Sequence, residues 1–129
     1  MRAGPIVLDA SALIASIYEE QGAQIVDRYL PHAMISTVNL TEVASYMVRG
    51  GMPIESTQEL LKDLSLTIAP YDEDQALLAA KLLPVTAPKG LSLGDRACLA
   101  LAIMRNLPVL TADKAWKSLD LDVKIEMIR

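Results

Sequence analysis

The sequence predicts an α/β fold, a three-layer α/β/α sandwich with a central parallel sheet of about five strands. Short runs of Val, Ile and Leu that read as buried strands alternate with longer segments of helical periodicity. Apolar residues make up 52% of the chain and include no Phe, which suits helices packed on a parallel sheet. The intervening helices supply the crossovers that parallel strands require. At 129 residues, we expect a single domain spanning residues 1–129.

The first quarter of the chain reads as strand, helix, helix and strand. Residues 5–9 ("PIVLD") predict a buried strand, and residues 33–37 ("AMIST") predict the next one. Helical periodicity fills residues 11–18 and 20–30 between them, and Gly22 marks the break between the two helices.

Two helices are expected after the second strand. Asn39 can cap a helix that ends at Gly50 and Gly51. Pro53 suits the first turn of another helix, which runs to about Leu64.

The second half of the chain repeats the alternation. Residues 66–71 predict a strand, and residues 72–83 predict a helix with acidic residues in its first turn. Residues 84–90 ("PVTAPKG") are expected to form a loop before the longest apolar helix, residues 92–106. The remaining predicted elements are a strand at 107–111, a short helix at 113–119 and a closing strand at 123–128.

Composition argues against several classes of protein. The longest uncharged apolar run, residues 97–104, is far shorter than the ~20 residues of a membrane span, so no membrane association is expected. The single cysteine, Cys98, lies in an apolar helix and is expected to be buried, which fits a reducing cytoplasm. With His32 as the only histidine, zinc and Ser-His-Asp chemistry are poorly supported. The net charge of −4 argues against coating nucleic acid by bulk electrostatics.

Four acidic residues stand apart from those on predicted helix surfaces. Asp9 closes the first strand, Asp113 follows the fourth strand, and Glu42 and Asp95 fall in the first turns of helices. Ligands of parallel α/β sheets bind beyond the carboxyl ends of the strands. We therefore expect the four carboxylates to face one edge of the sheet.

Each of these residues also has a purely structural interpretation. Asn39-x-x-Glu42 and Ser92-x-x-Asp95 both resemble capping boxes. Asp9 or Asp113 could equally cap the helix that follows, which typically contributes ~1 kcal/mol. The joint placement favours a site, because independent caps need not all fall on the ligand-binding edge.

Carboxylates gathered in one place require a cation. Two unit charges ~4 Å apart repel by ~4 kcal/mol at an effective dielectric near 20. Oxygen ligands without His or Cys favour Mg²⁺ or Mn²⁺, which suit a phosphate-ester substrate. The chemistry indicated is metal-assisted phosphodiester cleavage, with an activated water as nucleophile.

Four segments, in order and across nearly the whole chain, resemble the PIN-domain ribonucleases, and most closely VapC-type toxins of toxin–antitoxin pairs. The segments are "IVLDASAL", "NLTEVASY", "LSLGDRACLALA" and "VLTADKAW". The resemblance implies a metal-dependent endoribonuclease in which Asp9, Glu42, Asp95 and Asp113 bind the divalent ion. It further implies a homodimer, RNA as the substrate, and a cognate antitoxin that covers the active-site groove in a heterotetramer or a larger complex.

Three neighbouring residues receive secondary roles. Ser11 and Thr111 match small hydroxyl positions of the family and are expected to hydrogen-bond a ligand carboxylate or a metal-bound water, although ordinary capping explains them equally well. Arg96 follows Asp95 and is a candidate for balancing charge or meeting a phosphate, unless it points elsewhere.

The sequence is also compatible with two alternative functions. A Mg²⁺-binding receiver or phosphotransfer-like domain shares the α/β architecture, but Asp9 has no adjacent acidic partner. A catalytically silent PIN-like binding scaffold is the second alternative. Residues 10–20 and 55–64 are plausible docking surfaces for a partner helix, or ordinary core faces.

Overall fold

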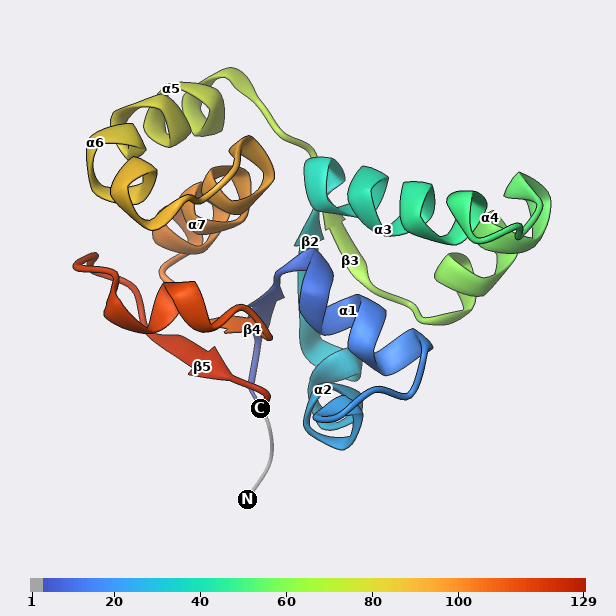
Figure 1. The fold of residues 1–129 in the computed structure, drawn as a ribbon. Coiled ribbons are helices and arrows are strands. Elements are labelled where there is room, and N and C mark those ends of the chain that lie inside the picture. The colour runs from blue at the N-terminus through green and yellow to red at the C-terminus, as the bar shows by residue number, and fades with distance from the viewer. Residues whose placement is uncertain (1–3) are drawn as a thin grey trace.

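A five-stranded, all-parallel sheet forms the centre of the molecule (Figure 1). The computed structural model describes residues 4–129, so residues 1–3 of the predicted domain lie outside the described part. The spatial order of the strands is β3-β2-β1-β4-β5. Their bounds are β1 (Ile6–Leu8), β2 (Ala33–Ser36), β3 (Thr67–Ala69), β4 (Val109–Thr111) and β5 (Ile125–Met127).

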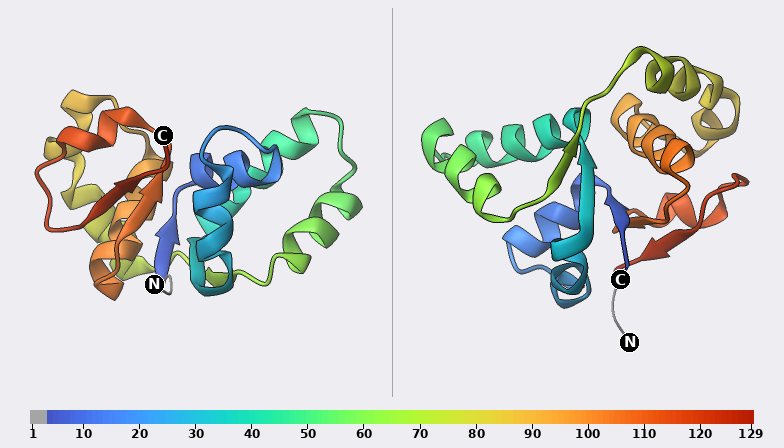
Figure 2. Two further views of the ribbon diagram at one scale, coloured as in Figure 1. Left: turned by 90° about the horizontal axis from the view of Figure 1, so that it is seen from below. Right: turned by 180° about the vertical axis from the view of Figure 1, so that it is seen from behind.

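Helices pack on both sides of this sheet, which confirms the predicted α/β/α sandwich (Figure 2). On one side lie α1 (Ala10–Ile17), α2 (Ala23–Tyr29), α3 (Thr37–Arg49) and α4 (Ile54–Asp63). On the other side lie α5 (Glu73–Lys81), α6 (Leu83–Thr86) and α7 (Leu93–Arg105). Three 3₁₀ segments complete the described chain: η1 (Leu30–His32), η2 (Ala87–Lys89) and η3 (Lys114–Ser118). Within residues 4–129, no helix has the length and apolar character needed to cross a membrane.

The strands divide the apolar interior into two cores. Ile6 and Leu8 of β1 pack with the helices of one side, while Val7 between them packs with α7 on the other. This alternation follows from the two-residue side-chain period of a strand, and burial on both faces explains why β1 is apolar throughout. Cys98 is fully buried in the second core, as predicted.

Three sequence predictions are corrected by the structure. Most of the loop predicted at 84–90 belongs to α6 and η2, because each proline sits in the first turn of its segment, where a missing N–H costs nothing. The predicted helix at 113–119 is the 3₁₀ segment η3. Asn39 is not a cap: α3 begins at Thr37, and the Ser36 hydroxyl accepts the capping hydrogen bond from the Val38 N–H at 3.2 Å.

The strand order reverses between β1 and β4. Strands β2 and β3 extend from one side of β1, and β5 extends from the far side of β4. Ligand sites of parallel sheets lie in the crevice beyond the carboxyl ends of the strands at such a reversal. Asp9 and Ala112 are the first residues after these two strands, so the sheet topology places their neighbourhood at the expected position for a site.

We predict that Gly22→Ala destabilises the fold more than Gly51→Ala. Both glycines have positive φ angles, +95° and +102°, which cost a non-glycine residue about 1 to 3 kcal/mol. A methyl group at position 22 would additionally lie 2.9 Å from the Ile128 side chain, whereas nothing lies within 4 Å of one at position 51. Urea denaturation measures both free energies of unfolding, and equal losses would contradict the prediction.

Candidate active site at the β1–β4 edge

Asp9 is a buried carboxylate held by two hydroxyl groups. Its exposed fraction is 4%. Ser11 Oγ donates a hydrogen bond to Asp9 Oδ2 at 2.7 Å, and Thr111 Oγ1 donates to the same oxygen at 2.9 Å. Although Asp9 stands at the N-cap position of α1, its side chain makes no capping hydrogen bond. The capping interpretation of Asp9 is therefore excluded.

The two hydroxyls are themselves fixed by backbone donors. Ala112 N–H donates to Ser11 Oγ at 3.0 Å, and Asp113 N–H donates to Thr111 Oγ1 at 3.1 Å. Because each hydroxyl accepts an N–H from the turn after β4, its own hydrogen is directed to Asp9. The end of β1 and the end of β4 are thereby joined through one carboxylate oxygen.

Asp95 and Asp113 each use one oxygen as a cap. Ser92 N–H donates to Asp95 Oδ2 at 2.8 Å, and Asp95 N–H donates to Ser92 Oγ at 3.3 Å, which confirms the capping box at the start of α7. Ala115 N–H donates to Asp113 Oδ1 at 3.0 Å at the start of η3. In both residues the other oxygen remains available for a second role.

Glu42 projects from α3 toward the start of α7. Asn39 Nδ2 donates to Glu42 Oε1 at 2.8 Å and to the Gly94 carbonyl oxygen at 2.9 Å. Gly94 precedes Asp95, so this amide joins the helices that carry two of the predicted site residues. Asn39 and Gly94 were not identified as site residues from the sequence, because Asn39-x-x-Glu42 matches a capping pattern equally well.

The charges of these side chains act on one another. The pKa of Asp9 is raised to about 6, chiefly by burial and in smaller part by the charges of Asp95 and Glu42, against the lowering effect of the Ser11 and Thr111 hydrogen bonds. Burial also raises the pKa of Asp95, and the charge of Asp113 adds to that rise. The four residues therefore form one electrostatic group, which we call the carboxylate cluster.

Cys98 lies close to the same charges. Burial raises the pKa of its thiol well above the usual range, and Asp9, Asp95 and Glu42 contribute to the rise. Since only the thiolate is a good nucleophile, Cys98 is a packing residue and not a reactive one.

Every member of the carboxylate cluster has one oxygen that makes no hydrogen bond within residues 4–129. These atoms are Asp9 Oδ1, Glu42 Oε2, Asp95 Oδ1 and Asp113 Oδ2. Neither ion pair among the described residues includes a member of the cluster. The mutual repulsion of the carboxylates is thus left without a protein cation.

The donor set matches a hard divalent cation in chemistry. All four candidate donors are carboxylate oxygens, the ligand type of Mg²⁺ and Mn²⁺. In their present rotamers, no three His, Cys, Asp or Glu side chains in the described chain are grouped closely enough to hold a metal. An ion held by all four carboxylates therefore requires some of these side chains to move closer together.

Arg96 points toward α5. Its Nη1 donates to the Ala79 carbonyl oxygen at 3.1 Å, and its buried Nε has no partner within the described chain. The guanidinium therefore ties α7 to α5 in this structure, and the sequence-based role in balancing charge or binding phosphate stays a prediction.

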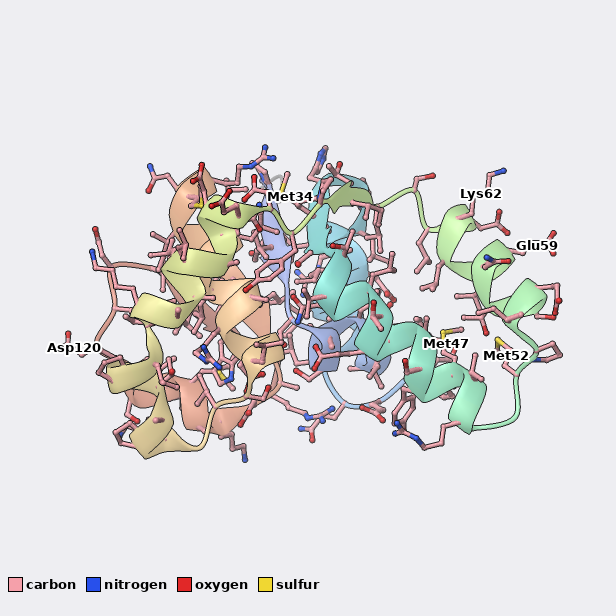
Figure 3. All side chains as sticks on the ribbon, turned by 90° about the horizontal axis from the view of Figure 1, so that it is seen from above. Met34, Met47, Met52, Glu59, Lys62 and Asp120 are labelled. Carbon is pink, nitrogen blue, oxygen red and sulfur yellow. The ribbon has the colours of Figure 1, made fainter. Side chains whose placement is uncertain are left out.

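An apolar groove of about 890 Å³ lies between α3 and α4, and no member of the carboxylate cluster lines it. Figure 3 shows α3 and α4 side by side, with Met47 and Met52 near the turn that joins them and Lys62 projecting from α4. Residues 55–64, one of the two predicted docking surfaces, contribute four residues to the lining. The apolar lining is formed mainly by Leu40, Ala44, Val48, Ile54, Leu61, Leu66 and Ile68.

We predict that the metal-free protein loses stability as the pH rises from about 4 to about 6. The folded state holds the Asp9 proton more tightly than the unfolded chain does, because its pKa is raised from 3.8 to about 6. The free energy of unfolding consequently falls through this window by about 2 kcal/mol from Asp9 alone. Asp9→Asn should match the wild type near pH 4 and exceed its stability at pH 7.5. Urea denaturation at both pH values measures the free energies of unfolding. An Asp9→Asn variant that is no more stable than the wild type at pH 7.5 would contradict the prediction.

The sequence matches the PIN domain over residues 6–121. No curated protein matches the sequence significantly.

Several solved structures share the fold over nearly their whole length. A toxin–antitoxin complex from Klebsiella pneumoniae matches with a TM-score of 0.75 and 20% identity, covering 96% of this chain and 98% of that one. VapBC-5 from Mycobacterium tuberculosis matches with a TM-score of 0.65 and 27% identity, covering 98% and 99%. VapC20 of Mycobacterium tuberculosis, described as a sarcin-ricin loop cleaving toxin, matches with a TM-score of 0.69 and 13% identity, covering 92% and 98%. The chain therefore belongs to the PIN domain family and has the fold of the VapC toxins.

Proposed function

We propose that this protein is a metal-dependent endoribonuclease and the toxin of a toxin–antitoxin pair. The observation that carries the proposal is the carboxylate cluster at the strand-order reversal, in which each member keeps one oxygen free and none is neutralised by a protein cation. The PIN domain match supports nuclease chemistry. The likeness to a toxin described as cleaving the sarcin-ricin loop supports RNA as the substrate class.

The proposed roles follow from how each side chain is held. Asp9, the most rigid of the four, would provide the fixed ligand for Mg²⁺ or Mn²⁺, with Glu42, Asp95 and Asp113 completing the set. When bound, the ion supplies charge neutralisation and activation of water for attack on a phosphodiester. Ser11 and Thr111 orient Asp9 and keep its Oδ1 directed away from their hydroxyls. The amino end of α7 adds partial positive charge near the phosphate.

The strand order separates this proposal from the receiver-like alternative. Receiver domains have the strand order 2-1-3-4-5, in which the first strand lies between the second and the third. Here β1 lies between β2 and β4. A silent PIN-like scaffold has the same topology as the nuclease, and only an activity measurement distinguishes the two.

We further propose that the groove between α3 and α4 receives an amphipathic segment of the cognate antitoxin. The solved neighbours include toxin–antitoxin complexes. The groove is apolar, and Arg49 and Lys62 lie on its lining, which suits a segment with apolar and acidic residues. The homodimer and the heterotetramer or larger complex with the antitoxin, expected from the resemblance, are part of this proposal.

We predict that the purified protein cleaves total cellular RNA in the presence of Mg²⁺ or Mn²⁺ and that EDTA abolishes cleavage. Asp9→Asn should reduce the rate by about 100-fold or more, because loss of a ligand costs at least as much as loss of a residue that orients one. Asp122→Asn, which changes the same charge on an exposed loop outside the cluster, should keep the activity. Mapping of the cleaved ends measures the outcome. Activity that survives both EDTA and Asp9→Asn would refute the metal-dependent mechanism, and no activity under any metal would support the silent scaffold.

For the groove, we predict that Val48→Asp weakens binding of the protein encoded beside this one in the genome by 10-fold or more, because a carboxylate would be buried against an apolar partner. Met104→Asp is the matched control: Met104 has a similar exposure, 46% against 43%, and does not line the groove. Isothermal titration calorimetry gives both affinities. Equal weakening by the two variants would count against the groove as the docking site.

A further inference from the structure

Asn39 occupies a position where an amide is difficult to accommodate. It lies in the first turn of α3 with no exposed surface. Its Nδ2 donates one hydrogen bond to Glu42 Oε1 at 2.8 Å and a second to the Gly94 carbonyl oxygen of α7 at 2.9 Å. Its Oδ1 is buried and has no hydrogen-bond partner within the described chain.

The orientation of this amide is determined by its neighbours. If the amide were reversed, Oδ1 would face a carboxylate oxygen and a carbonyl oxygen, two acceptors that offer it no hydrogen. The observed orientation satisfies both neighbours and leaves Oδ1 unpaired, which costs free energy in a buried site. An apolar residue of similar size would avoid that cost, so packing alone does not account for Asn39.

Gly94 also lies close to the Glu42 carboxylate. A Cβ built on Gly94 would lie 2.6 Å from Glu42 Cδ and Oε1 and even closer to Oε2. The carboxylate therefore rests against the bare backbone of α7, in a space that any side chain would fill. Two independent features, an amide from α3 and a missing side chain on α7, fix one exposed glutamate.

We infer that Asn39 and Gly94 are positioning residues that hold Glu42 beside Asp95 for cation binding. The Asn39 amide donates to Glu42 Oε1 and leaves Glu42 Oε2 available for an ion. Its second hydrogen bond, to the Gly94 carbonyl oxygen, fixes the distance between α3 and the start of α7, where Asp95 lies. A solvent-exposed glutamate otherwise samples many rotamers, and ordering its side chain when an ion binds costs conformational entropy. The contacts with Asn39 and Gly94 order the Glu42 side chain before the ion binds, so this cost does not reduce the affinity for the ion. The inference rests on the proposed function, because it assigns Glu42 and Asp95 to the same ion.

The test is Mn²⁺ binding, measured by isothermal titration calorimetry with the metal alone. Asn39→Ala should weaken Mn²⁺ binding by about 10- to 100-fold, the usual effect of removing a residue that orients a ligand. Glu42→Gln should weaken it at least as much. In a variant that combines Asn39→Ala with Glu42→Gln, the Mn²⁺ affinity should be no lower than in Glu42→Gln alone, because Asn39 acts through the Glu42 carboxylate. A merely structural role would give losses that add.

The matched control is Ser16→Ala. Ser16 Oγ donates to Asp27 Oδ1 at 2.6 Å, which also links two helices through a carboxylate, but away from the cluster. This variant should bind Mn²⁺ like the wild type.

Gly94→Ala tests the inference without removing a buried polar group. Alanine is the better helix former, and the obstructed atoms belong to the end of a flexible side chain. The melting temperature of the metal-free variant should stay close to that of the wild type, while Mn²⁺ binding weakens by 10-fold or more. If Asn39→Ala fails to fold, this variant alone decides.

The outcomes separate this inference from the proposed function. If the wild type binds Mn²⁺ and cleaves RNA but Asn39→Ala and Gly94→Ala bind Mn²⁺ normally, the positioning role is overturned and the nuclease proposal stands. If the wild type binds no Mn²⁺, both are overturned.

Discussion

The hydrogen bonds from Ser11 and Thr111 to one oxygen of Asp9 are the interaction on which the arrangement of the site depends. A carboxylate that is 4% exposed at the end of a central strand is costly to ionise, as its raised pKa shows. The two hydroxyls lower that cost, and the backbone amides of Ala112 and Asp113 keep them oriented. Because these amides belong to the turn after β4, the position of Asp113 is linked to that of Asp9. The carboxylates from the first and last thirds of the chain are thereby brought to one edge of the sheet.

Much of this architecture was predictable, because short apolar runs between helical segments are strong local signals. The strand ends, and with them the positions of Asp9 and Asp113, follow from that pattern, and the Ser92–Asp95 capping box formed as predicted. The role of Asn39 was not predictable, since Ser36 at the end of β2 and Asn39 are both good caps and only the packed structure shows where α3 begins. The contact between Glu42 and Gly94 joins residues 52 positions apart, and no local pattern encodes it. The prediction of a loop at 84–90 was wrong because proline interrupts a helix only after its first turn.

Helix α3 presents different chemistry on two of its faces. Asn39 and Glu42 face α7 and the carboxylate cluster, while Leu40, Ala44 and Val48 line the groove shared with α4. Figure 3 shows this helix between the α5–α7 group and α4. A partner seated in the groove would therefore contact the same helix that positions Glu42. Regulation by a bound partner needs no direct contact with the carboxylates if the partner shifts this helix.

The fixed direction of the two hydroxyls also determines where a proton on Asp9 must reside. Oδ2 already accepts two hydrogens, so the neutral acid carries its own hydrogen on Oδ1. Oδ1 is the only oxygen of Asp9 left to coordinate an ion. Proton and cation therefore compete for a single atom, and binding of a divalent ion in mildly acidic solution should release a proton from Asp9. Acidification of the surroundings would weaken the site through this exchange alone.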